Sequence, residues 1–171
     1  MVEMKKGFTL VELLVVVAIL GVLAAVGIVS FGGYMSRTKV TAIKNQVNDV
    51  AKFIQLKMTE CSMNPGSMNL HTPASWDQFL TNPGHCVNSS MEQMKAGIYN
   101  HINDTWNQFN VYEKKTPALY SGPYNTNPSQ GYIHFGFFDQ NGRKYFILYA
   151  NLGDHLSNTE KYYSREIDYW E

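Results

Sequence analysis

A single carboxylate lies within the most apolar part of this 171-residue chain. Although the sequence holds 14 acidic and 14 basic residues, Glu12 is the only charged residue between Gly7 and Ser36. A carboxylate in a membrane helix costs on the order of 2–3 kcal/mol and is seldom retained without a partner. The side chains one or two helical turns away offer no expected partner: Phe8, Thr9, Val16 and Ile19. A cut before Phe8 would create an α-amine four residues from Glu12, able to pair with it in the same copy or in another.

Two cysteines, Cys61 and Cys86, flank a segment rich in Asn, Pro, Gly and Ser. His71 and His85 lie close by, but the spacing Cys-x9-His-x13-His-Cys matches no ordinary zinc site. Two thiols in a small, loop-rich exported region are typical of a disulfide. The sequence therefore predicts a Cys61–Cys86 disulfide and no metal. Closing this 26-residue ring would stabilise the fold by about 3–4 kcal/mol on chain-entropy grounds.

Other patterns that could support catalysis or cofactor binding are weak. The sequence lacks a Gly-rich phosphate loop and a His-Glu-x-x-His motif. Asp139-x-Asn141-Gly142 resembles part of a calcium loop, yet the downstream Glu of a full EF-hand loop is missing. A tight turn explains these residues better, and a lone histidine such as His134 is usually packed. We therefore predict a protein that is not an enzyme and needs no cofactor.

Composition narrows the remaining classes of protein. The chain is 44% hydrophobic with balanced charge, which is incompatible with a disordered or collagen-like protein. Its length suits one globular core. Neutrality argues against a protein whose main role is to neutralise nucleic-acid phosphates.

The apolar segment from Phe8 to Met35 is 28 residues long, enough for a helix to cross a hydrocarbon core of ~30 Å. Three interpretations compete: a cleaved secretory signal, a plain membrane anchor, and a helix that is both anchor and assembly element. Leu23-Ala24-Ala25 could serve as a secretory cleavage site. However, the segment is too long for a secretory h-region, which also rarely contains a carboxylate near its start.

The stretch Lys5-Lys6-Gly7-Phe8-Thr9-Leu10-Val11-Glu12 resembles the class III signal of type IV prepilins and type II secretion pseudopilins. The resemblance covers residues 4–28 closely and the helix to about residue 60 more loosely. It implies that a prepilin peptidase cuts between Gly7 and Phe8 and methylates the Phe8 amine. It also implies that Glu12 pairs with the terminal amine of an adjacent subunit during assembly. Members of these families often carry a proline where this chain has Val29, so no proline kink is expected.

The membrane orientation is set by two conflicting signals. Lys5 and Lys6 precede the apolar segment, whereas Arg37, Lys39 and Lys44 follow it, so the positive-inside rule mildly favours a cytoplasmic head. The specific signal motif and the cysteines outweigh that rule. We expect an inner-membrane precursor with its head outside the cytoplasm.

Beyond the apolar segment, hydrophobic residues recur every three or four positions, as in one face of an amphipathic helix: Val40, Ile43, Val47, Val50, Ala51, Ile54 and Met58. The helix is therefore predicted to continue to Thr59 and to pack this face on a sheet. Basic residues dominate the rest of 37–57, with a net charge of +4. These charges either face solvent or meet acidic neighbouring subunits or lipid headgroups.

The head should combine short helices with a β-hairpin. Short helices are predicted after Thr72-Pro73 and at Ser90, where Ser90-x-x-Gln93 forms a capping box. Strands at 132–138 and 144–150 flank an Asn-Gly turn signal. The tail from Gly153 is compatible with a helix beginning near Ser157 or with a third strand.

The predicted fold is α+β and pilin-like, with a long N-terminal helix whose C-terminal half packs on a small antiparallel sheet. The expected parts are a leader at 1–7, a helix at 8–59 whose membrane part is 8–35, and a head at 60–171. Within the head we expect a disulfide-bearing loop region at 60–130, a hairpin at 131–150 and a tail at 151–171.

The resemblance implies a structural subunit of a type IV pilus that polymerises with itself through the apolar helix. Its expected partners are the prepilin peptidase, the pilus assembly machinery and the inner membrane. The fibre would support adhesion, motility or DNA uptake outside the cell. Two alternatives remain open: a type II secretion pseudopilin in a periplasmic fibre, and a minor pilin that binds DNA or a surface through Lys114 and Lys115.

Overall fold

The computed structural model describes residues 7–63, 70, 90–106, 108–114, 117–121 and 127–169. Two compact units divide the chain between Thr38 and Lys39. Helix α1, Leu10–Met63, contributes to both units. The helix predicted after Thr72-Pro73 lies outside the described residues.

In the first unit α1 is an uninterrupted helix through four glycines and without a proline. Its side chains are exposed in the single chain; Leu10 is 80% and Val29 79% exposed. This helix is long and apolar enough to cross a membrane. The predicted long helix is confirmed, and it ends four residues later than Thr59.

In the second unit the C-terminal half of α1 packs one face into the core. The predicted apolar stripe is confirmed, because six of its seven members are buried: Ile43, Val47, Val50, Ala51, Ile54 and Met58. The seventh, Val40, is partly buried against the same core. The spacing of these residues keeps them on one side of the helix, where a sheet can cover them.

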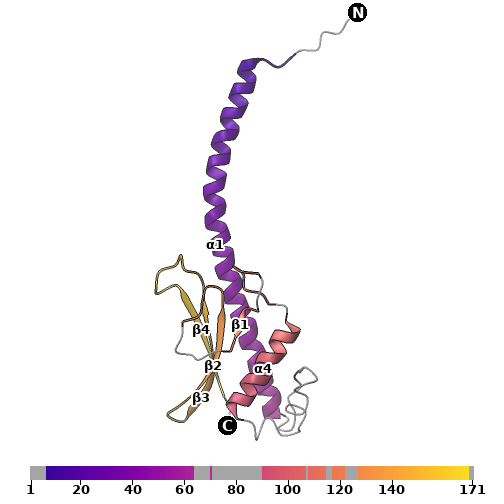
Figure 1. Cartoon of the computed structure of the whole chain (residues 1–171), viewed down its shortest axis with the longest axis vertical. Helices are drawn as coiled ribbons and strands as arrows, with labels where there is room; N and C mark the ends of the chain where they lie inside the picture. The colour runs from indigo at the N-terminus through magenta and orange to yellow at the C-terminus, as the bar shows by residue number, and fades with distance from the viewer. Residues whose placement is uncertain are drawn as a thin grey trace, which may run out of the picture. The chain divides into compact units, whose positions relative to one another are not determined.

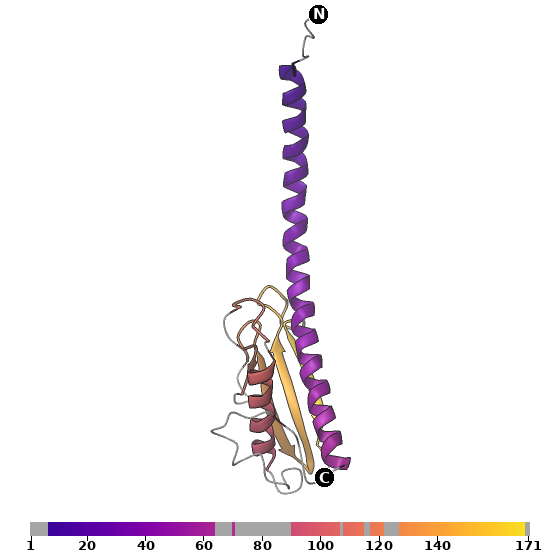
Figure 2. The ribbon, with the colours of Figure 1, turned by 90° about the vertical axis from the view of Figure 1, so that its right-hand side faces the viewer.

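Helix α4, Met91–Thr105, begins at the predicted capping box. Ser90 accepts a bond from the Gln93 main-chain N–H at 3.3 Å, and the Gln93 side chain accepts one from the Ser90 N–H at 2.9 Å. The two bonds satisfy main-chain donors that a helix start leaves open. Side chains of α4 contact α1, since His101 stacks on Phe53 with ring centroids 5.0 Å apart. Figure 2 shows both helices together with the sheet.

The sheet has four strands in the order β1-β2-β3-β4, seen together in Figure 1. They are β1 Leu119–Tyr120, β2 Ile133–Gln140, β3 Arg143–Asn151 and β4 Tyr162–Asp168. Asn141 and Gly142, with φ of 53° and 79°, form the predicted turn between β2 and β3. Strands β2, β3 and β4 are antiparallel, but β1 pairs parallel to β2, so the sheet is mixed rather than wholly antiparallel.

Both helices cover the face of the sheet that carries Ile133, Phe135, Phe146 and Leu148. These residues share one face because alternate side chains of a strand point the same way. Phe135 and Phe146 are fully buried with ring centroids 5.6 Å apart. The core of the head is thus a two-layer packing of helices on a sheet.

The tail forms a strand, which settles the choice between helix and strand. The Ser157 hydroxyl donates to Glu160 Oε2 at 2.8 Å and the Glu160 N–H bonds the Ser157 carbonyl oxygen at 2.9 Å, but only a turn follows. Tyr163 then pairs with Ala150, and Ile167 with Phe146. Burial of Ile167 and pairing with β3 outweigh the local helix-start signal.

Three lysines of α1 contact aromatic rings instead of forming an open basic face, and two of these rings lie outside the helix. Lys39 lies 4.6 Å from the ring centroid of Tyr112, and Lys44 lies 5.6 Å from that of Tyr163. Lys57 is buried, with its ammonium group 2.8 Å from Glu60. Much of the predicted basic surface therefore stabilises the head itself.

Truncating the core face of α1 should destabilise the head. Ile54 is fully buried, so Ile54→Ala should lower the free energy of unfolding by about 2–5 kcal/mol. Leu56→Ala is the matched control on the same helix, because Leu56 is 54% exposed and its loss should change stability by less than about 0.5 kcal/mol. Denaturation of the detergent-solubilised chain, followed by near-UV circular dichroism, measures both. Equal effects would contradict this core assignment.

Candidate functional site

The candidate site is the first turn of α1, where Glu12 finds hydrogen-bond donors on a neighbouring residue of the same turn. Glu12 Oε2 accepts hydrogen bonds from the Thr9 main-chain N–H at 2.8 Å and from the Thr9 hydroxyl at 2.7 Å. The Glu12 N–H lies 3.3 Å from Thr9 Oγ1. With α1 beginning at Leu10, Thr9 is the N-cap and Glu12 the third helical residue. The arrangement is a capping box.

The prediction that Glu12 has no partner one turn away is wrong, because Thr9 bonds its carboxylate. Thr9 supplies two donors to one carboxylate oxygen, and no positive side chain is needed for them. Hydrogen bonds to an ionised acceptor are stronger than those between neutral groups. A negative side chain in the first turn also interacts favourably with the helix dipole. Both effects reduce the cost of holding Glu12 at the start of a membrane-length helix.

Gly7 and Phe8 lie just outside this helix start. Neither belongs to α1, and the Phe8 side chain is 82% exposed. The bond between them precedes the N-cap, so Thr9 and Glu12 both lie on its C-terminal side. A cut at this bond would leave all three hydrogen bonds of the capping box in place.

The signal that locates Thr9 is present in the sequence. Thr9-Leu10-Val11-Glu12 fits the pattern Ser/Thr-x-x-Glu/Gln immediately before an apolar run. The same pattern located the start of α4 at Ser90. At Glu12 the donors are the hydroxyl and main-chain N–H of the residue three positions earlier, and no cationic group is required.

The other predicted site residues do not join this turn. Cys61 lies in the last turns of α1, partly buried against the core of the head. Cys86 lies outside the described residues, so the Cys61–Cys86 disulfide stays a prediction. Lys114 is exposed with a φ of 58°, and Lys115 lies outside the described residues. His134 is 8% exposed in β2.

Within the part of the chain that the structure describes, no group of three or more His, Cys, Asp or Glu side chains could hold a metal ion. The calcium-like residues lie in a β-hairpin instead: Asp139 belongs to β2 and pairs with Lys144 of β3, and Asn141 and Gly142 form the turn between the two strands.

Comparison with known proteins places the start of α1 in a recognised motif. The family model described as the prokaryotic N-terminal methylation motif matches residues 4–28. A type IV major fimbrial protein, FimA, of Dichelobacter nodosus is 29% identical over 119 residues, covering 63% of this chain and 74% of the relative. A fimbrial protein of Pseudomonas aeruginosa is 50% identical over 44 residues, or 26% of this chain and 29% of the relative. No solved structure matches.

Coverage differs among these relatives. A second Dichelobacter nodosus FimA matches over only 35% of its length, at 38% identity. The alignments with the Pseudomonas protein and the second FimA are therefore short, and they cover about a third of each relative.

The methylation motif at residues 4–28, the capped apolar helix and the α+β head are features that the chain shares with prepilin-like proteins carrying a class III signal. The chain is similar to the type IV fimbrial proteins of Dichelobacter nodosus and Pseudomonas aeruginosa.

Removing the Thr9 hydroxyl should loosen the first turn of α1. Thr9→Val deletes one donor to Glu12 and the acceptor of the Glu12 N–H, a loss of about 1 kcal/mol for a cap. Amide hydrogen exchange of Glu12 in detergent micelles should accelerate about fivefold. Thr9→Ser keeps the hydroxyl and should exchange at the wild-type rate. Identical rates in all three chains would show that the capping box does not protect this turn.

Proposed function

We propose that this protein is a structural subunit of a type IV pilus, held in the inner membrane as a precursor and polymerised through residues 8–35. The observation that carries the proposal is a carboxylate fixed by a capping box at the start of an exposed, membrane-length helix. The fimbrial relatives support a structural subunit over an enzyme.

The first step is removal of the leader by a prepilin peptidase. The Gly7–Phe8 bond lies in the extended chain before the N-cap, where a peptidase can reach it without unwinding α1. Cleavage creates a positive amine at Phe8, which the same enzyme methylates in the proposed pathway. The capping box remains whole, so the mature chain keeps Glu12 aligned near its new terminus.

The second step is pairing between copies. Both bonds from Thr9 end on Oε2 of Glu12, which leaves Oε1 as the acceptor for the Phe8 amine of an adjacent subunit. In an apolar surrounding such a pair is weakly screened. An unpaired charge there would be costly, so the pair fixes the register between neighbouring helices.

Besides the ion pair, packing of the apolar helices against one another contributes to the free energy of assembly. Burial of apolar surface is worth ~25 cal/mol per Å² relative to water. Lipid already solvates these helices before assembly, so the net gain is much smaller. An assembly machine that extracts subunits from the membrane is consistent with that small gain. The finished fibre lies outside the cell, with the head exposed along it.

The relatives also bear on the alternatives. They carry the name of fimbrial proteins, which favours a pilus over the periplasmic fibre of a type II secretion pseudopilin. Binding of DNA or a surface through Lys114 and Lys115 stays a sequence prediction, since no described contact adds support.

The variant Glu12→Gln separates capping from charge. Glutamine can complete a capping box but cannot pair with an amine as an ion. We expect Glu12→Gln to be inserted and cleaved normally, yet to yield at least ~10-fold fewer filaments, because the partner amine loses its counter-charge. Immunoblots of sheared filaments and mass spectrometry of the cell-associated chain measure the two steps.

Two controls sharpen this test. Glu12→Ala loses both the cap and the charge, whereas Thr9→Ser keeps both. The proposal expects Thr9→Ser to assemble fully and Glu12→Ala to assemble no better than Glu12→Gln. Wild-type filament levels in Glu12→Gln would overturn the proposed ion pair.

A further inference from the structure

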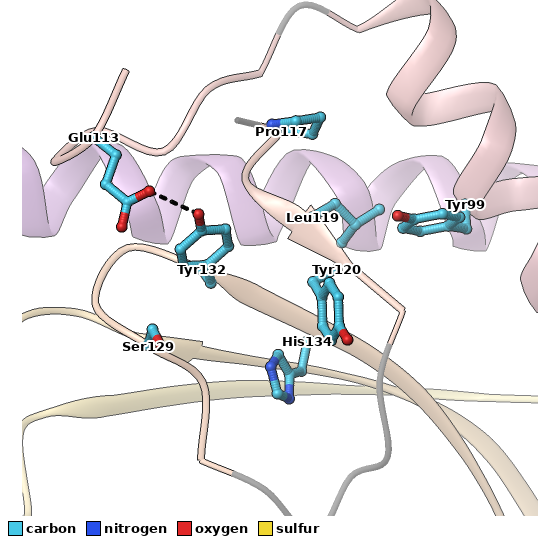
Figure 3. A pocket seen from close by; sticks show the side chains of 8 residues that line it. All are labelled: Tyr99, Glu113, Pro117, Leu119, Tyr120, Ser129, Tyr132 and His134. Atoms are coloured by element: carbon cyan, nitrogen blue, oxygen red, sulfur yellow. Dashed lines mark hydrogen bonds between the residues drawn. The ribbon is translucent and has the colours of Figure 1, made fainter. Parts of the chain in front are cut away.

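The head contains a pocket of about 530 Å³ beside the edge strand β1, and Figure 3 shows its lining side chains. Four lining residues carry rings: Tyr99, Tyr120, Tyr132 and His134. Pro117 and Leu119 add aliphatic side chains to the wall, and Ser129 and Glu113 complete the described lining. A concave, largely apolar site with a few polar groups is typical of a small-ligand pocket.

Among the described lining residues Glu113 is the only Asp, Glu, Lys or Arg, and His134 is the only histidine. The Tyr132 hydroxyl donates a hydrogen bond to Glu113 Oε2 at 2.8 Å, the dashed line in Figure 3. A fixed carboxylate repels anions and attracts cations. Phosphates and acidic ligands are therefore disfavoured here.

The segment that carries Glu113 is held from inside the head by Asn110. This side chain is fully buried and donates to the Gln130 carbonyl oxygen at 2.9 Å. Its Oδ1 accepts the main-chain N–H groups of Tyr112 at 2.8 Å and of Glu113 at 3.3 Å. Anchoring by a buried polar network sets the position of Glu113 before any ligand binds.

Elsewhere in the head, aromatic rings are paired with the chain's own cations. Six described rings lie within 4.6–5.7 Å of a Lys or Arg: those of Phe53, Tyr112, Phe137, Tyr145, Tyr162 and Tyr163. By contrast, neither Tyr99 nor Tyr120 lies under any Lys or Arg that the structure describes. Tyr120 is 50% exposed, so a ligand can reach its ring from solvent.

We propose that this pocket binds a small organic cation of the quaternary ammonium type. Tyrosine faces attract such a group through their ring electrons, and Glu113 supplies the opposite charge. A primary ammonium is more strongly hydrated, so it loses more hydration free energy on leaving water. A methylated ammonium loses little hydration on entering a site walled by rings, Leu119 and Pro117, and the pocket also has room for the molecule that carries it.

Choline is the probe that tests this proposal, against its neutral carbon isostere in which a tert-butyl group replaces the trimethylammonium group. Saturation-transfer NMR is recorded on the full chain in a polyoxyethylene detergent, which contains neither sugar nor choline. Choline should bind about tenfold more tightly than the isostere, because only choline carries charge. Equal affinities, or no saturable binding of choline, would overturn the proposal.

Variants of Glu113 and Tyr120 test whether choline binds in this pocket. Glu113→Gln keeps an acceptor for Tyr132 and should weaken choline about tenfold while leaving the isostere unchanged. Tyr120→Leu should weaken choline at least fivefold, whereas the exposed, ring-preserving Tyr120→Phe should not. Choline binding that is indifferent to Glu113→Gln or to Tyr120→Leu would place it outside this pocket and overturn the assignment.

Two further ligands test whether the pocket prefers free choline, its phosphate ester or a neutral sugar. Phosphocholine should bind more weakly than choline because its phosphate approaches Glu113, so tighter binding of phosphocholine would contradict the charge argument. Methyl glucoside tests a sugar site. Saturable binding of the glucoside in preference to choline would identify a neutral ring ligand and overturn the proposal. None of these readouts depends on filament assembly.

Discussion

A carboxylate at the start of a membrane-length helix has to find donors, because unpaired charge in an apolar surrounding is costly. Here the donors are the main-chain N–H and hydroxyl of Thr9, both bound to Oε2 of Glu12. The helix start needs an acceptor for its open N–H groups, and the carboxylate needs donors. One turn of chain meets both needs. The same turn leaves the carboxylate near the residue that becomes the terminus in the proposed pathway.

The 14 acidic and 14 basic residues are distributed unevenly, and many of them pair within the head. Some of the lysines that give α1 its positive charge have partners within the second unit: Lys39 lies over the Tyr112 ring, and Lys57 pairs with Glu60 of the same helix. On the opposite part of the sheet, Arg143 bonds both Glu166 and Asp168. Opposite charges are thus paired within the head itself, while the first unit is left with one carboxylate in its apolar segment. The charges that stabilise the head are therefore different residues from the carboxylate at the start of the helix.

The sequence predicted those elements that are determined by residues close together along the chain. The stripe through Ile43 and Ile54, the cap at Ser90 and the Asn141-Gly142 turn all required only neighbours along the chain. The tail did not, because Ser157 and Glu160 form a local turn while pairing with β3 determines the strand. The position and parallel pairing of strand β1 could not be predicted, since a two-residue edge strand leaves no periodic signal. The partner of Glu12 was predictable from Thr-x-x-Glu, but the pocket was not, because Tyr99, Glu113 and His134 meet only in the folded head.

The central claim is that the chain becomes functional by gaining a terminus immediately before its capping box. Intact-mass and N-terminal analysis of the membrane or filament form tests it most directly. The account predicts a chain of 164 residues that begins at methylated Phe8, because the leader of residues 1–7 is removed. A chain that begins at Met1 or Val2, or one cut near Val26 within the apolar helix, would contradict it.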